Sequence, residues 1–203
     1  MTTNSKDIRT QTGDILRSGL QTILDKHGEV HIVGSYALGL MTWRDLDIHV
    51  VRQDRDVRAF FDLGGEIACF LKPHRMHFRD ESTVCTPGLP RGFYWVSTWV
   101  TNVAEPGRST SGRRIDRRST WVRRFGEDLS ARLNDTNRAV ILEIKAACWQ
   151  HSRYRRGFTS ADVCTAVLDR DVRDVPGFWA GLRERKGILG PIGLKALCHR
   201  ISE

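Results

Sequence analysis

Apolar and polar residues alternate with two different periods along the first hundred positions. Residues 12–26 carry apolar side chains three and four positions apart, which is the stripe of an amphipathic helix. Other short stretches are continuously apolar or alternate every second residue, as strands do. The predicted strands are 29–33, 46–51, 75–80 and 92–100, and further helices are predicted near 36–41 and over 55–71. This succession of strands and helices predicts a small mixed sheet of the α/β (α+β) class.

The pattern becomes helical in the last third of the chain. Residues suited to a helix N-terminus precede three apolar stretches: Asp135 or Thr136, Thr159 or Ser160, and Pro176 at the start of a helix over 176–186. The sequence therefore predicts two domains, an α/β domain over residues 1–125 and a helical domain over residues 126–203.

Two carboxylates stand on the predicted strand 46–51 and at its beginning. Asp45 and Asp47 are two residues apart, so their side chains point to the same face of the sheet, with Cα atoms about 7 Å apart. Leu46 and Ile48 point the other way, into a core. Two like charges held together repel each other unless a cation lies between them, and oxygen ligands suit Mg²⁺ or Mn²⁺. The pair therefore predicts a metal site.

A Gly-Ser turn ends the preceding strand. Gly34 allows a close backbone approach to phosphate, and Ser35 adds a hydroxyl where a helix is predicted to begin. The sequence Val33-Gly34-Ser35, then nine residues, then Asp45-Leu46-Asp47-Ile48 resembles the signature of the DNA polymerase beta-like nucleotidyltransferase superfamily. The alternative is a surface turn followed by an edge-strand aspartate pair that only makes the sheet more soluble.

The resemblance implies a function for residues 1–125 as a nucleotidyltransferase-like domain. A nucleoside monophosphate, AMP from ATP, would pass to an acceptor hydroxyl on a small molecule, a protein or an RNA. Asp45 and Asp47 would bind Mg²⁺ (or Mn²⁺), and Gly34 and Ser35 would contact the triphosphate. Members of this superfamily have a third acid on a neighbouring strand, and the candidates here are Asp116 as a catalytic residue and Asp80 as its rival.

Two residues next to the aspartates, Arg44 and His49, are expected to have no catalytic role. Arg44 is expected to face solvent, with contact to phosphate as the alternative. His49 shares the face of Asp45 and Asp47, and is expected to be a packed strand histidine rather than an acid or base.

Composition narrows the class of protein. The hydrophobic share of 40% and charged share of 28% are typical of a globular protein. No apolar run approaches the ~20 residues that span a bilayer, and the first residues lack a secretory pattern, so we expect a cytoplasmic protein with no membrane partner. The five cysteines are scattered singly, which predicts reduced, mostly buried thiols.

The basic charge is concentrated in one segment. Residues 107–124 hold seven arginines and one aspartate, a balance of +6 within a chain of net charge +8, so the remainder carries +2. Such a segment is typical of a solvated loop, with RNA or triphosphate binding as the alternative. Its flanks of arginine also argue against a buried strand around Asp116.

One hypothesis explains this composition. Similar small bacterial nucleotidyltransferase-domain proteins carry a KIDIW-like strand here, and codons for RKIDIW read in a shifted frame give Pro-Gly-Arg-Ser-Thr-Ser-Gly, the string at residues 106–112. About 96–125 would then be translated out of frame, and the third acid would be lost. A catalytically impaired, antitoxin-like binding protein is therefore an alternative to the enzyme, and a basic RNA-binding protein is another.

Overall fold

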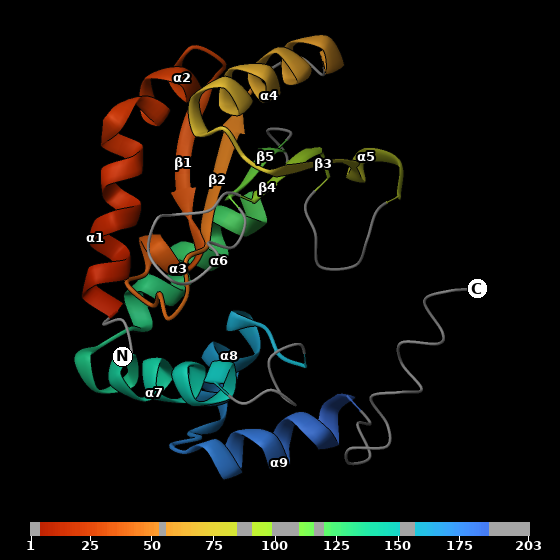
Figure 1. The fold of residues 1–203 in the computed structure, drawn as a ribbon. Coiled ribbons are helices and arrows are strands. Elements are labelled where there is room, and N and C mark those ends of the chain that lie inside the picture. The colour runs from red at the N-terminus through yellow and green to blue at the C-terminus, as the bar shows by residue number, and fades with distance from the viewer. Residues whose placement is uncertain are drawn as a thin grey trace. The chain divides into compact units, whose positions relative to one another are not determined.

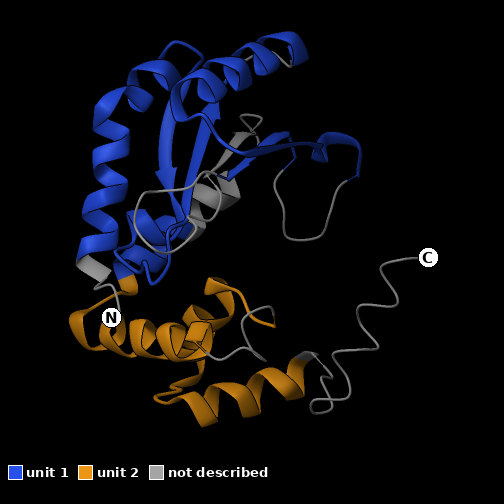
Figure 2. Cartoon of the chain, in the orientation of Figure 1, with its two compact units in different colours: residues 1–131 blue, residues 132–203 orange. Residues whose placement is uncertain are grey.

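The structure, a computed structural model, divides the chain into two compact units (Figure 2), residues 1–131 and 132–203. It describes residues 5–52, 56–84, 91–98, 110–115, 120–150 and 157–186, and for 5–6, 110–115 and 120–125 it describes the backbone alone. The boundary predicted from sequence, at 125/126, falls inside helix α6 (Thr120–Arg132).

A five-stranded mixed sheet forms the centre of the first unit (Figure 1). Its strands are β1 (Glu29–Val33), β2 (Leu46–Val51), β3 (Arg75–Asp80), β4 (Phe93–Thr98) and β5 (Thr110–Ile115), in the order β1-β2-β5-β4-β3. β2 and β5 are parallel, and the other neighbours are antiparallel. The predicted fold class is confirmed, but β5 was not predicted, because its sequence TSGRRI has neither an apolar run nor an alternating pattern.

Helices precede and follow the strands of this sheet along the chain. α1 (Ser5–Ile15) continues through η1 (Leu16–Leu20), where Gly19 has a φ of 137° and kinks the chain, into α2 (Gln21–Asp25), so the helical segment starts earlier than the predicted residue 12. α4 (Val57–Leu71) begins after Asp56, whose Oδ1 accepts hydrogen bonds from the amides of Arg58 and Ala59. Two single-turn helices, α3 (Gly34–Ala37) and α5 (Glu81–Val84), follow β1 and β3.

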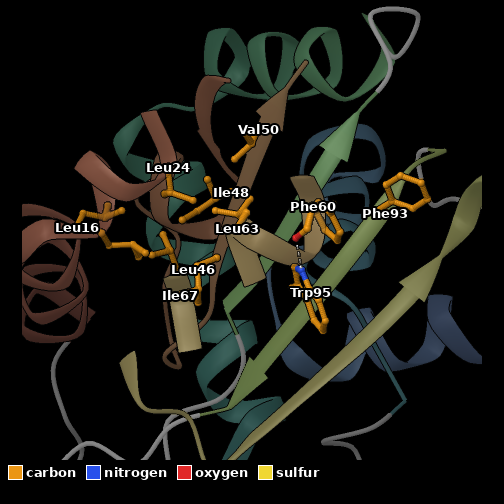
Figure 3. Close-up of a cluster of buried hydrophobic side chains, with 11 residues drawn as sticks. Leu16, Leu24, Leu46, Ile48, Val50, Phe60, Leu63, Ile67, Phe93 and Trp95 are labelled. Carbon is orange, nitrogen blue, oxygen red and sulfur yellow. Dashed lines mark hydrogen bonds between the residues drawn. The ribbon is translucent and has the colours of Figure 1, made fainter. Parts of the chain in front are cut away.

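One face of the sheet packs against these helices and forms the core. Leu46, Ile48 and Val50 of β2 lie in one buried cluster with Leu63 and Ile67 of α4 (Figure 3). Trp95 of β4 joins the same cluster, and its Nε1 donates a hydrogen bond of 3.0 Å to the Phe60 carbonyl. A Cβ on Gly64 would lie 2.5 Å from the Trp95 ring, so this close helix–sheet contact requires glycine.

The second unit is helical, as predicted. It contains α7 (Asp135–Gln150), α8 (Ser160–Arg170) and α9 (Val175–Lys186). Thr159 caps α8 through a capping box with Asp162. The core includes Cys148 and Cys164, while Cys69 of the first unit is exposed. No helix in the described parts of the chain is long and apolar enough to cross a membrane.

Candidate functional site

The two aspartates lie where β2 begins. Asp45 directly precedes the strand, and Asp47 is its second residue. Ile48 is only 1% exposed on the core face, whereas Asp45 and Asp47 are half-buried. The alternation of β2 therefore separates an apolar face from a face that carries the carboxylates, as the sequence predicts.

Gly34 lies against Asp47. The antiparallel pairing of β1 and β2 places Val33 opposite Asp47, so the turn after β1 begins beside that carboxylate. Gly34 has a φ of 66°, and a Cβ there would lie 2.5 Å from Asp47 Oδ2. Both the left-handed backbone and the lack of space require glycine at this position. The structure thus brings together Gly34 and Asp47, which are far apart in the sequence motif.

The loop that joins the two halves of the motif is held by backbone hydrogen bonds. Ser35 lies in α3, and its carbonyl accepts a hydrogen bond of 2.8 Å from the Leu40 amide. Gly39 has a φ of 66° and turns the chain back toward β2. This tight connection returns the chain within nine residues, so that Asp45 and Asp47 lie near the Gly-Ser turn.

The expectation that Arg44 faces solvent was wrong. Arg44 is 9% exposed, and its Nη2 and Nε donate hydrogen bonds of 2.7 and 3.2 Å to Gln11 Oε1. Gln11 belongs to the part of α1 that precedes the predicted helix, so the sequence offered no partner for the arginine. The expectation for His49 is confirmed, because this histidine is packed in the strand and 3% exposed.

Asp80 is not near the aspartate pair. It ends β3, which is separated from β2 by both β4 and β5. Its Oδ1 accepts hydrogen bonds from the amide and the hydroxyl of Ser82, at the start of α5. Asp80 therefore caps a helical turn, and the structure contradicts it as a third acid beside Asp47.

Asp116 lies outside the described residues. The residue before it, Ile115, pairs with Val51, whereas Asp47 pairs with Ser111 at the other end of β5. Ile115 lies four positions after Ser111 along β5, a distance of about 13 Å. The end of β5 nearest the aspartates is therefore not the end that leads to Asp116.

The strand β5 itself corrects one expectation. Residues 107–124 were expected to form a solvated loop, yet Thr110–Ile115 pairs with β2 on one side and β4 on the other. These six residues read TSGRRI and include no acid. Within the described part of β5, no carboxylate stands beside the Asp45–Asp47 pair.

The aspartates suit a metal that is shared with a substrate. Among the residues whose side chains are described, no cluster of three or more histidine, cysteine or acidic ligands occurs. Mg²⁺ is commonly bound by one or two carboxylates, together with substrate phosphates and water. Asp47 contributes one such carboxylate, and its Oδ2 lies directly against the backbone of Gly34.

Comparisons with known proteins agree with this geometry at the level of the fold. No protein-family model matches the chain, and no curated protein does. The solved structure of Cid1, described as an RNA terminal uridylyl transferase, matches with a TM-score of 0.51 at 16% identity. The chain therefore shares its fold with the matched part of Cid1. The match covers 81% of this chain and 51% of the Cid1 chain, so this chain spans about half the length of Cid1.

Proposed function

We propose that this chain transfers a nucleoside monophosphate, AMP from ATP, to an acceptor hydroxyl in a reaction that depends on Mg²⁺ or Mn²⁺. The observation that carries the proposal is the contact of Gly34 with Asp47 beside Asp45. Through this contact, the Gly-Ser turn proposed to bind phosphate lies beside the aspartates proposed to bind the metal.

Each element has a chemical task in this proposal. Asp45 and Asp47 would hold the metal, which draws charge from the phosphates during transfer. Gly34 would present its backbone to the triphosphate at the turn beside Asp47, and Ser35 would offer its hydroxyl to a phosphate oxygen. The acceptor oxygen forms a bond to the α-phosphorus, the bond from that phosphorus to the bridging oxygen breaks, and pyrophosphate leaves. The acceptor proton passes to a base or to water.

The test uses the full chain with ATP labelled on the α-phosphate, Mg²⁺ and a set of acceptors that includes RNA. Release of pyrophosphate together with a labelled acceptor supports transfer. Omission of the metal should abolish both signals. If the chain neither binds nor turns over ATP in the presence of Mg²⁺ or Mn²⁺, the proposal fails.

A second candidate function is supported by the sequence of β5. In the out-of-frame hypothesis, the lost aspartate codon overlaps the codons of Ser109 and Thr110. Thr110 pairs with Leu46, the residue between the two aspartates. An aspartate at the start of β5 would belong to the strand next to the one that carries Asp45 and Asp47, and its loss predicts a protein that binds nucleotide and metal but transfers poorly.

The coding DNA tests this candidate directly. If no pair of single-base shifts around codons 96–125 restores a KIDIW-like strand, the hypothesis is rejected. ATP binding without turnover in the assay above favours the impaired protein. Asp116 lies outside the described residues, so its role as the third acid stays a prediction.

A further inference from the structure

A second basic segment lies at the edge of the sheet. Residues 72–79 read KPHRMHFR, so five of these eight residues are lysine, arginine or histidine, and the first acid is Asp80. All five basic side chains are exposed. We call this segment the basic edge.

The fold of the first unit holds the basic edge in place. α4 ends at Leu71, and Lys72 is its C-cap in the left-handed conformation, with its amide bonded to the Ala68 carbonyl. β3 then runs along the outside of the sheet, where it pairs with β4 and has no second strand partner among the described residues. An outer strand of this kind presents its side chains and one row of backbone groups to a ligand.

The basic edge shares a sheet face with the aspartates. Arg75, His77 and Arg79 alternate along β3 and so point to one face. The pairing runs from His77 to Val96, from Val96 to Ser111, and from Ser111 to Asp47, so all four residues lie in one row on that face. Three strand spacings separate His77 from Asp47, a distance of about 14 Å.

Two aromatic rings are exposed on the other side of the same strand. Phe78 is 36% exposed, Phe61 of α4 is 46% exposed, and their ring centroids lie 4.8 Å apart. Cations that bind phosphate and rings that stack on bases are the combination that binds single-stranded nucleic acid, and here they lie on the two sides of one outer strand. The inner sides of both rings pack on Trp95, with centroids 5.1 and 5.5 Å away, and the rest of each ring is exposed.

We propose that the basic edge binds the phosphate backbone of single-stranded RNA and that the acceptor of the transfer reaction is an RNA 3′ hydroxyl. The second part rests on the proposed function. Arg79 forms an ion pair with Glu81, so it is partly neutralised. Lys72 and Arg75 form no ion pair within the described residues, and they are the cations we assign to phosphate contacts.

The experiment measures binding of a fluorescent single-stranded RNA of about 15 nucleotides to the full chain by anisotropy. The double variant Lys72→Ala/Arg75→Ala should bind at least about tenfold more weakly, and the slope of log K against log salt should become less negative by about 1.4. The matched control is Arg17→Ala/Lys26→Ala, which removes the same charge from exposed positions elsewhere in the first unit. It should retain both the affinity and the slope.

A second variant tests stacking without a change of charge. Phe61→Ala should weaken RNA binding about fivefold or more while leaving the salt slope unchanged. Circular dichroism and the thermal midpoint check that each variant is folded. If folded Phe61→Ala protein binds RNA with wild-type affinity, the aromatic pair is not part of the RNA site.

The outcomes separate this inference from the proposed function. Asp45→Asn should bind RNA as tightly as the wild type. If Lys72→Ala/Arg75→Ala binds RNA as the control does, or if the wild type does not bind RNA, the inference is overturned and the metal site is unaffected. If RNA binding requires the basic edge but no labelled RNA forms, the RNA site stands and the assignment of an RNA 3′ hydroxyl as the acceptor is overturned. A concentration-dependent dimer in sedimentation that the double variant abolishes would assign the edge to a second copy and also overturn the inference.

Discussion

The two faces of β2 differ in what their side chains do. Leu46, Ile48 and Val50 are buried in the apolar cluster that packs α4 against the sheet, and their exposure is 1–2%. Asp45 and Asp47 project from the other face beside a glycine that has no room for a side chain. One strand therefore contributes both to the core and to the candidate site.

This difference shows how a site can be added to a fold with little change in its stability. The apolar face holds β2 between β1 and β5, and so fixes where the aspartates stand. The polar face carries charges that do not help the sheet to fold. Substitutions on the two faces should therefore affect different measurements.

The largest effect is expected at the polar face. Asp47→Asn should lower metal-dependent transfer by roughly a hundredfold or more, because it removes a charged metal ligand. The free energy of unfolding should change by less than about 1 kcal/mol, since the residue is half-buried and nearly unchanged in shape. Initial rates and urea unfolding of the same preparation check both statements. Equal rates for variant and wild type would contradict the role of the carboxylate.

The apolar face should show the opposite result. Ile48→Ala should destabilise the protein by about 2–5 kcal/mol, because it leaves a cavity in the core. Ile48→Val is the graded control and should cost about 0.5–1.5 kcal/mol. Under conditions where both variants remain folded, nucleotide affinity should match that of the wild type. Selective loss of nucleotide binding in a folded Ile48→Val protein would show that the two faces are not independent.

Gly34 lies between the two effects, because it belongs to the site and to the backbone turn. Gly34→Ala should cost about 1–3 kcal/mol through the left-handed conformation, and it should also weaken nucleotide binding by displacing Asp47. Gly65→Ala is the matched control, since a Cβ there meets no atom within 4 Å and the residue lies inside α4. That variant should be as stable as the wild type or up to about 1 kcal/mol more stable. If Gly34→Ala and Gly65→Ala have the same free energy of unfolding and the same nucleotide affinity, the special geometry of Gly34 is refuted.

The smallest effect is expected away from both faces, at the contact between α4 and the end of α2. Hydrogen bonds from His27 and Lys26, of 2.8 and 3.1 Å, lower the pKa of Glu66 from its ordinary 4.5. A lowered folded-state pKa means that the stabilisation is present above the ordinary value and is lost as pH falls through the folded-state pKa. Glu66→Gln should therefore be less stable than the wild type at pH 7, by under about 1 kcal/mol for this exposed group, and equally stable near pH 3.

Urea midpoints at the two pH values measure this difference. A Glu66→Gln deficit that is the same at both would mean that the charge of Glu66 contributes nothing. Neither Glu66→Gln nor Gly65→Ala should change metal binding, so both also serve as controls for the site.

Much of the fold follows from local sequence patterns. The predicted bounds 29–33, 46–51 and 75–80 are those of β1, β2 and β3, because each strand has its own apolar pattern and a turn at its end. β5 has no such pattern. It is held by pairing with β2 and β4, a non-local cause that no window of sequence reveals.

For the candidate site, the sequence predicted the position of the motif residues but not the contacts that depend on distant parts of the chain. The place of Gly34, Asp45 and Asp47 at one end of β1 and β2 follows from the spacing of the motif and an antiparallel return. The burial of Arg44 depends on Gln11, a residue far away in sequence. Asp80 is excluded as the third acid by the strand order, which places two strands between it and Asp47.

The most direct test of the central claim is whether Asp45 and Asp47 bind a divalent metal together with a nucleotide. The measurement is the water-proton relaxation enhancement of Mn²⁺ with a non-hydrolysable ATP analogue, with and without protein. The wild type should give a strong enhancement, and Asp45→Asn/Asp47→Asn should give none, although its circular dichroism and thermal midpoint match those of the wild type. The same enhancement from wild type and double variant, or no enhancement from the wild type, would contradict the account.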